Sequence, residues 1–224
     1  TPETRVARRT SPTNMGLGLL ASLAAYDFGY VGLAEVIRRT AATLATMHSL
    51  ERYRGHFYNW YDTETLAPLH PLYVSSVDSG NLAGHLLTLQ RGLLALQHEP
   101  VFRAVAIEGL RDTLGVLLQH VDGVNRAPLL AWSDDLRGVM AFPPLSMDAV
   151  VAFAESQADR LCKVAPAFVH EPSEETVFWL SRLTAQCDDL MAEAEPWRAA
   201  EGHRDGIPTL TQLAGGGAAG RDDP

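Results

Sequence analysis

The feature that most constrains the fold is a succession of segments in which apolar residues recur at helical spacing. Six segments of this kind are bounded by Pro, Ser, Asp or Gly residues that commonly open or close helices. We expect helices over about 11–28, 32–50, 78–96, 100–120, 146–168 and 173–194. Because the connections are mostly short, the chain is predicted to be all-α and built from helical hairpins.

Repeated helical hairpins predict a partial (α/α)6 toroid, in which inner and outer helices form a ring and the loops at one end form a pocket. A complete ring needs about twelve helices, and at roughly 11–12 residues per helix plus loops it exceeds this chain. At most half a ring is expected, over residues 11–200. Residues 1–10 are interpreted as a lead-in coil from a preceding domain, and the Gly-, Ala- and Asp-rich residues 201–224 as a disordered tail.

One stretch between the second and third predicted helices breaks the helical pattern. Residues 55–62 are rich in aromatic side chains, 62–65 contain turn-forming residues, and 72–77 are rich in residues that favour strands. This order predicts a single short β-hairpin among the helices.

Composition excludes several classes of function. The 18 basic and 27 acidic side chains give a net charge of −9, so an acidic chain without a basic patch is not expected to bind nucleic acid. The uncharged apolar run at 15–26 is shorter than the roughly 20 residues that cross a bilayer, so we expect a soluble, cytoplasmic segment. The histidines show no metal-ligand spacing and no phosphate-binding loop is found, so no metal or cofactor is predicted.

Three polar clusters could carry chemistry. The first is at the start of the first helix, where hydroxyl groups, an arginine and free backbone amides meet: Arg9, Thr10, Ser11 and Asn14. The second alternates aromatic and polar residues, as a sugar-binding strand does: His56, Asn59, Trp60, Tyr61 and Asp62. The third is at the start of the third helix: Asp78, Ser79 and Asn81.

Each cluster also has a purely structural interpretation. The first could be a helix cap with a solvated arginine, and the second a hairpin packed under the helices. Asp78 could be the N-cap of the third helix, although one carboxylate oxygen can hold backbone amides while the other faces a ligand. The residues alone leave these alternatives open.

The same clusters carry a resemblance to a known family. The segments RTSPTNMGLGLL, ERYRGHFYNWYDTETLAPL and YVSSVDSGNLAGHL, in this order and spacing, resemble the glycoamylase-like segment of bacterial cyclic β-1,2-glucan synthases. The resemblance is clearest over residues 5–120 and fainter as far as Leu213. It implies a large, multidomain, inner-membrane enzyme that polymerises glucose from UDP-glucose, closes the β-1,2-glucan into a ring by transglycosylation in an (α/α)6 barrel, and trims the chain with a phosphorylase-like portion.

The resemblance implies that this chain is the N-terminal half of the ring-closing barrel. Its partners would be a β-1,2-glucan chain, the remaining half of the barrel and the other domains of the parent enzyme. The residues that would then line the glucan subsites are Arg9, Thr10, Ser11, Asn14, His56, Asn59, Trp60, Tyr61, Asp62, Asp78, Ser79 and Asn81.

The catalytic carboxylates of this family are expected in later barrel segments that do not occur here. Glycoside chemistry needs two carboxylates that flank the scissile bond. No catalytic residue is therefore assigned, and the chain is predicted to be inactive by itself. Two alternatives are a stand-alone helical module that binds an oligosaccharide or a protein without catalysis, and a purely structural half-domain.

Overall fold

The computed structural model describes residues 6–168, 172–198 and 206–216. The chain divides into two compact units. Unit 1 consists of Thr1–Ala24 and Ile37–Ala95, and unit 2 of Ala25–Val36 and Leu96–Pro224. Helices make up most of the described residues, so the predicted all-α class is confirmed. Within these residues no helix is both long and apolar enough to cross a membrane.

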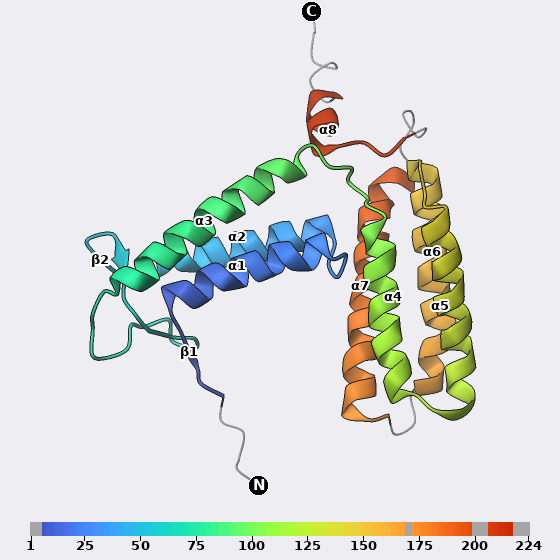
Figure 1. Ribbon diagram of the computed structural model, residues 1–224, viewed down its shortest axis with the longest axis horizontal. Helices are drawn as coiled ribbons and strands as arrows, with labels where there is room; N and C mark the ends of the chain where they lie inside the picture. Colours follow the sequence, from blue (N-terminus) through green and yellow to red (C-terminus); the bar gives the residue numbers. More distant parts are fainter. Residues whose placement is uncertain (1–5, 169–171, 199–205, 217–224) are drawn as a thin grey trace, which may run out of the picture. The chain divides into compact units, whose positions relative to one another are not determined.

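Unit 1 is built on three helices with short strands around their ends (Figure 1). The first two helices each extend across the boundary between the units, so that the end of one and the start of the next belong to unit 2. The elements are β1 (Arg9–Thr10), α1 (Pro12–Asp27), α2 (Leu33–Ser49), β2 (Arg52–Tyr53), β3 (His56–Phe57), β4 (Tyr61–Asp62) and α3 (Ser76–Leu96).

Helices α1 and α3 pack in parallel through two glycines. A Cβ atom added at Gly16 of α1 would lie 2.5 Å from Nδ1 of His85 on α3, and one added at Gly92 of α3 would overlap Leu23 of α1. From the first of these contacts to the second, the position advances by seven residues along α1 and by seven residues along α3. The two helices therefore run in the same direction. The N-termini of α1 and α3 therefore lie at the same end of unit 1 (Figure 1).

The strands form two small antiparallel pairs. Strands β2 and β3 make a hairpin whose turn uses Arg54 and Gly55, both with positive φ (50° and 88°). Strand β1 pairs with β4, with Arg9 opposite Asp62. A short hairpin therefore lies between α2 and α3, but at 52–57 and not between 55–62 and 72–77 as predicted. No strand forms at 72–77, where α3 begins, and Arg9–Thr10, predicted as coil, form a strand before α1.

In unit 2, four helices form a bundle in which each packs against two neighbours (Figure 1). They are α4 (Val105–Leu117), α5 (Arg126–Ala141), α6 (Met147–Val164) and α7 (Glu174–Arg198), with 3₁₀ turns at Leu118–His120, Gly123–Asn125 and Ala165–Phe168. A single apolar core is shared by the four helices and includes fully buried leucines such as Leu114 and Leu183. Short connections make consecutive helices antiparallel.

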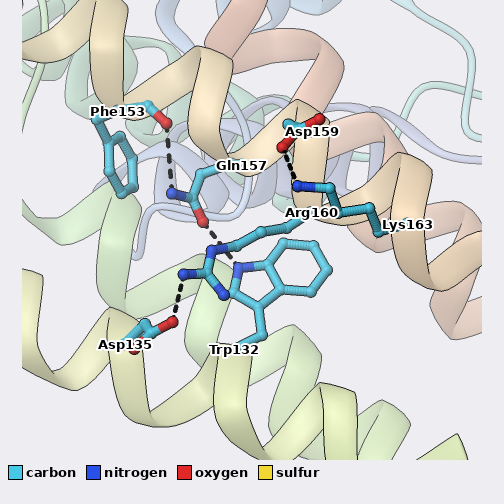
Figure 2. Close-up of polar contacts among 7 residues, drawn as sticks. All are labelled: Trp132, Asp135, Phe153, Gln157, Asp159, Arg160 and Lys163. Atoms are coloured by element: carbon cyan, nitrogen blue, oxygen red, sulfur yellow. Dashed lines mark hydrogen bonds and ion pairs between the residues drawn. The ribbon is translucent and has the colours of Figure 1, made fainter.

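Helix α5 was missed in the sequence, where 126–141 was not assigned to any element. Its buried residues Leu129, Trp132 and Leu136 follow the i, i+3, i+7 spacing of an amphipathic helix, so the sequence did contain a signal for it. The helix is fixed by α6, where Gln157 accepts a hydrogen bond from Trp132 Nε1 at 2.8 Å (Figure 2). Arg160 of α6 also forms an ion pair with Asp135.

The loop between α1 and α2 belongs to unit 2 and packs against α4 and α7. Gly29 has a φ of +74°, and a Cβ atom there would collide with the carbonyl group of Val105. The backbone N–H of Gly32 donates to Asp189 Oδ2 at 3.1 Å, and that of Leu33 donates to Glu193 Oε1. Two carboxylates from α7 therefore hold the first backbone amides of α2.

Residues 11–200, predicted as the N-terminal half of one barrel, include helices of both units, and the helices of unit 2 form a bundle. Within the tail predicted to be disordered, Leu210–Gly216 form helix α8, and Val101 N–H donates to the Pro208 carbonyl at 2.8 Å. The rest of that prediction, at 201–205 and 217–224, lies outside the described residues, as does most of the lead-in at 1–5.

Candidate functional site

The candidate site lies in unit 1, where the N-termini of α1 and α3 meet the loop that carries β4. Serine side chains cap both helices: Ser11 Oγ accepts from the N–H of Asn14 at 3.3 Å, and Ser75 Oγ accepts from the N–H of Asp78 at 3.1 Å. The interpretation of Asp78 as the N-cap is therefore wrong. Asp78 lies in the first turn of α3, and its carboxylate is available for contacts outside its own helix.

Both oxygens of the Asp78 carboxylate are held by other elements. Thr13 Oγ1 of α1 donates to Asp78 Oδ1 at 2.6 Å and accepts from Asn81 Nδ2 at 3.2 Å. When the amide of Asn59 is oriented with its nitrogen toward Asp78, it donates to Asp78 Oδ2 at 2.9 Å. The carboxylate therefore joins α1, α3 and the loop before β4.

Asn59 connects this carboxylate to two aromatic residues. In the same orientation its side-chain oxygen accepts from Trp60 Nε1 at 2.6 Å and from the Tyr73 hydroxyl at 2.5 Å, and its backbone N–H donates to the Tyr73 carbonyl at 2.9 Å. The guanidinium of Arg9 lies 4.6 Å from the centre of the Trp60 ring, a cation–π distance. The indole is thus fixed by its edge and on one face, while the residue remains partly exposed.

The surroundings of Asp78 favour its charged form. Partial burial raises the pKa of this carboxyl, but hydrogen bonds from Thr13, Ser75 and Ser11 outweigh the burial and lower the pKa below its ordinary value. The parallel N-termini of α1 and α3 place two positive dipole ends at the same place. Asp78 is ionised at neutral pH, so it can accept hydrogen bonds from a ligand but cannot act as a proton donor.

Tyr61 and Asp62, both predicted to line the site, shape its loop instead. The Tyr61 ring is fully buried, and its hydroxyl accepts from Tyr58 N–H at 2.8 Å and donates to the Glu51 carbonyl at 2.7 Å. Asp62 Oδ1 accepts from the N–H of Thr65 at 2.7 Å and closes the turn after β4. The Tyr61 side chain therefore offers no surface to a ligand, whereas Asp62 stays partly exposed although Oδ1 is engaged in its own turn.

The remaining predicted residues lie around this centre. The Nδ1 atom of His56 and the Oγ atom of Ser79 are 3.4 Å apart, so the hairpin turn approaches the first turn of α3. Thr10 pairs with Tyr61 in the β1–β4 ladder, and Asn14 is exposed on the first turn of α1.

Two residues of this cluster were not selected from the sequence. Thr13 lies between Ser11 and Asn14, which were selected, and its hydroxyl could have been included with theirs. Tyr73 gave no such signal, because it lies in a stretch interpreted as a strand. Among the described residues, no group of three or more His, Cys, Asp or Glu side chains has the geometry to hold a metal ion.

An ionised carboxylate, amide groups and a partly exposed indole in one cluster define a surface suited to a polyhydroxylated ligand. No protein-family model matches the chain. The chain is 37% identical, over 159 residues that make up 70% of its length, to the cyclic β-(1,2)-glucan synthase NdvB of Rhizobium meliloti (strain 1021).

The resemblance to the cyclic β-1,2-glucan synthases is thereby confirmed, and the chain is related to this family. The chain spans only 5% of the length of the synthase that it matches. It therefore corresponds to a small segment of that relative.

Proposed function

We propose that this chain contributes glucan-binding subsites to the ring-closing, glycoamylase-like barrel of a cyclic β-1,2-glucan synthase. The observation that carries the proposal is the Asp78 cluster, in which three segments far apart in sequence meet around one ionised carboxylate. The relative's name supports a glucan as the ligand.

The chemistry of the cluster fits a glucose unit. The face of the Trp60 ring that Arg9 does not cover can stack against the C–H groups of a sugar. Asp78 and Asn81 provide an acceptor and an amide for hydroxyl groups at the N-terminus of α3. Because the cluster is already cross-linked without ligand, a glucan would bind with little further ordering of side chains.

The proposed role is binding without bond cleavage in the isolated chain. A glycosidase or transglycosylase pairs a protonated acid with a second carboxylate. The lowered pKa of Asp78 removes it as the acid, and Asp62 is engaged in its own turn. We infer that the catalytic pair comes from other parts of a longer, membrane-bound parent enzyme, with the present segment on the cytoplasmic side.

The parallel arrangement of α1 and α3 supports an inner-helix role in an (α/α)6 barrel. Both helices expose large apolar side chains: Leu17 on α1, and Leu87 and Leu94 on α3. A Cβ atom added at Gly18, Gly80 or Gly84 would meet nothing within 4 Å, so this surface has room for another layer. We propose that the remaining half of the barrel covers it in the parent enzyme.

The binding role is tested by calorimetric titration of the full 224-residue chain with linear β-1,2-gluco-oligosaccharides. Trp60→Ala and Asp78→Asn should each weaken binding at least tenfold, because each removes a contact to the sugar. Asp122→Asn, an exposed carboxylate of unit 2, is the matched control and should leave the affinity unchanged. Equal affinity in all three variants would refute the proposed site.

A further inference from the structure

An open groove in unit 2 lies outside the Asp78 cluster and has no part in the proposed function. It runs between α4 and α5, has a volume of about 490 Å³, and ends at Tyr30 in the α1–α2 loop. Gly115 and Val116 lie along its length on α4. Arg111 and Gln119 are eight residues apart, so the groove extends about 12 Å at the rise of 1.5 Å per residue.

One aromatic ring lines this groove, and a second ring lies beside the first. Tyr30 lines it, and the ring of Phe28 lies 6.2 Å from that of Tyr30. Phe28 is 63% exposed and Tyr30 42% exposed. Large aromatic side chains that remain exposed side by side offer apolar faces to a ligand.

The other lining residues mix donors and acceptors. Arg111 donates to the Met140 sulfur at 3.4 Å, a weak acceptor, so most of its five N–H donors remain for the groove. Asp112 is an acceptor beside the Tyr30 hydroxyl, which lies 3.5 Å from Oδ2. Gln119 and Ser133 can both donate and accept.

This combination points to a neutral, polyhydroxylated ligand. The groove is lined by two arginines, Arg111 and Arg137, and one carboxylate, Asp112. Arg137 forms an ion pair with Asp134 at 2.9 Å, so little net positive charge faces an anion in a chain of net charge −9. An apolar segment would leave the charged and amide groups without partners. A sugar chain presents C–H faces to the rings and hydroxyl groups to both donors and acceptors. Open grooves lined by aromatic and planar polar side chains suit such chains.

We propose that the α4–α5 groove is a second oligosaccharide-binding site, which takes a short stretch of the glucan handled by the parent enzyme. The identity of the sugar rests on the proposed function, whereas the groove itself does not depend on the Asp78 cluster. A segment with two separate sugar sites could hold a long glucan at two points and so raise the local concentration of chain at either.

Gly115 allows a sharp test of the groove. A Cβ atom at Gly115 meets nothing within 4 Å, so Gly115→Trp should fill the groove without disturbing the helix. Gly138 on α5 is equally open but does not line the groove, so Gly138→Trp is the matched control. Tyr30→Ala is a second variant that removes an aromatic face rather than filling space.

The measurement is an NMR titration of the full chain with linear β-1,2-gluco-oligosaccharides, in a Trp60→Ala background that disables the first site. We expect saturable binding with shifts at the amides of Gly115, Val116 and Ser133. Adding Gly115→Trp or Tyr30→Ala should weaken this binding at least tenfold, and Gly138→Trp should not change it.

Three outcomes would overturn the proposal in distinguishable ways. If Trp60→Ala alone abolishes all sugar binding, the groove is not a sugar site and the proposed function stands. If the unsubstituted chain binds no sugar, both proposals fail. If inorganic phosphate shifts the groove amides and the oligosaccharide does not, the groove is an anion site.

Discussion

Different kinds of interaction stabilise the interior of each of the two units. Around Asp78 in unit 1, side-chain hydrogen bonds join helix starts and loops, and the indole of Trp60 stays partly exposed. In the bundle of unit 2, apolar side chains fill the core, and the buried polar pair of Trp132 and Gln157 is satisfied internally. A partly exposed polar network keeps donors and acceptors that a ligand can reach, whereas a closed apolar core does not. The core contacts of the bundle therefore serve stability, and the proposed binding role belongs to the Asp78 cluster.

The largest effect should come from a cavity in the bundle core. Leu183→Ala removes a fully buried side chain from α7 and should cost about 2–5 kcal/mol of unfolding free energy. Hydrogen exchange measured by mass spectrometry should show faster exchange in α4 and α7 and unchanged exchange around Asp78. Leu130→Ala, at a 45% exposed position on α5, is the control and should change little. Faster exchange in both units would contradict the division between them.

Next in size is the buried hydrogen bond between α5 and α6. Gln157→Ala leaves Trp132 Nε1 without its acceptor and opens a small space, so we expect a loss of about 1–3 kcal/mol. Denaturant unfolding followed by tryptophan fluorescence measures this loss. Lys163→Ala, on the exposed face of the same helix, is the control and should leave the midpoint nearly unchanged, because its ion pair with Asp159 is solvated. An unchanged midpoint for Gln157→Ala would show that the indole finds another partner.

Asp78 provides the corresponding test in unit 1. Because a hydrogen bond to a charged group contributes roughly 1.5–3 kcal/mol, Asp78→Asn in the full-length parent enzyme should slow ring closure about 10- to 100-fold. Polymerisation from UDP-glucose should continue, so linear β-1,2-glucan should accumulate. Separation of cyclic from linear products measures both steps. Cyclic product at the unsubstituted rate would reduce Asp78 to a structural contact, and equal loss of both products would assign it to folding.

The same contrast explains how far sequence reasoning could reach. Helical spacing located α1, α2, α3, α6 and α7 well, but helix pairs in succession are equally consistent with a toroid and with a bundle. The helical spacing of apolar residues predicts which side chains face a core, but not which helices pack against each other. The bundle of unit 2 was therefore not predicted. Helix α5 depends on Trp132 reaching Gln157, a contact 25 residues away in sequence.

At the site, motif order identified residues that do converge, including Arg9, Asn59, Trp60 and Asp78. It could not separate Trp60, whose ring is partly exposed, from Tyr61, whose ring is fully buried, because alternation along a two-residue strand is too short to assign faces. Tyr73 was not selected because its hydrogen bond to Asn59 depends on the path of the loop that carries it, which the sequence pattern does not show.

The remaining test concerns the titration of a carboxylate in unit 2. Burial raises the pKa of Glu193 to about 7; the backbone N–H of Leu33 opposes this rise, and the nearby charge of Asp189 adds to it. The folded state therefore binds a proton that the unfolded state, with an ordinary pKa of 4.5, releases. The resulting stability is fully present below pH 4.5 and is lost as the pH rises through about 7.

We expect Glu193→Gln to remove this pH dependence, because the amide oxygen still accepts from Leu33 N–H but no longer titrates. The unfolding free energy of the unsubstituted chain, measured by denaturant titration, should fall between about pH 4.5 and 7 by up to roughly 3 kcal/mol, and that of the variant should stay flatter. Glu195→Gln, on the exposed side of α7, is the control, since its surface ion pair with Arg198 contributes little. Parallel pH profiles for the unsubstituted chain and Glu193→Gln would mean that the carboxylate is charged in the fold, held by the amides at the start of α2. The α1–α2 loop would then be held on α7 by attraction between ionised carboxylates and the N-terminus of a helix, as the Asp78 cluster is. The interactions that stabilise the two units would then be more alike than a comparison of their interiors suggests.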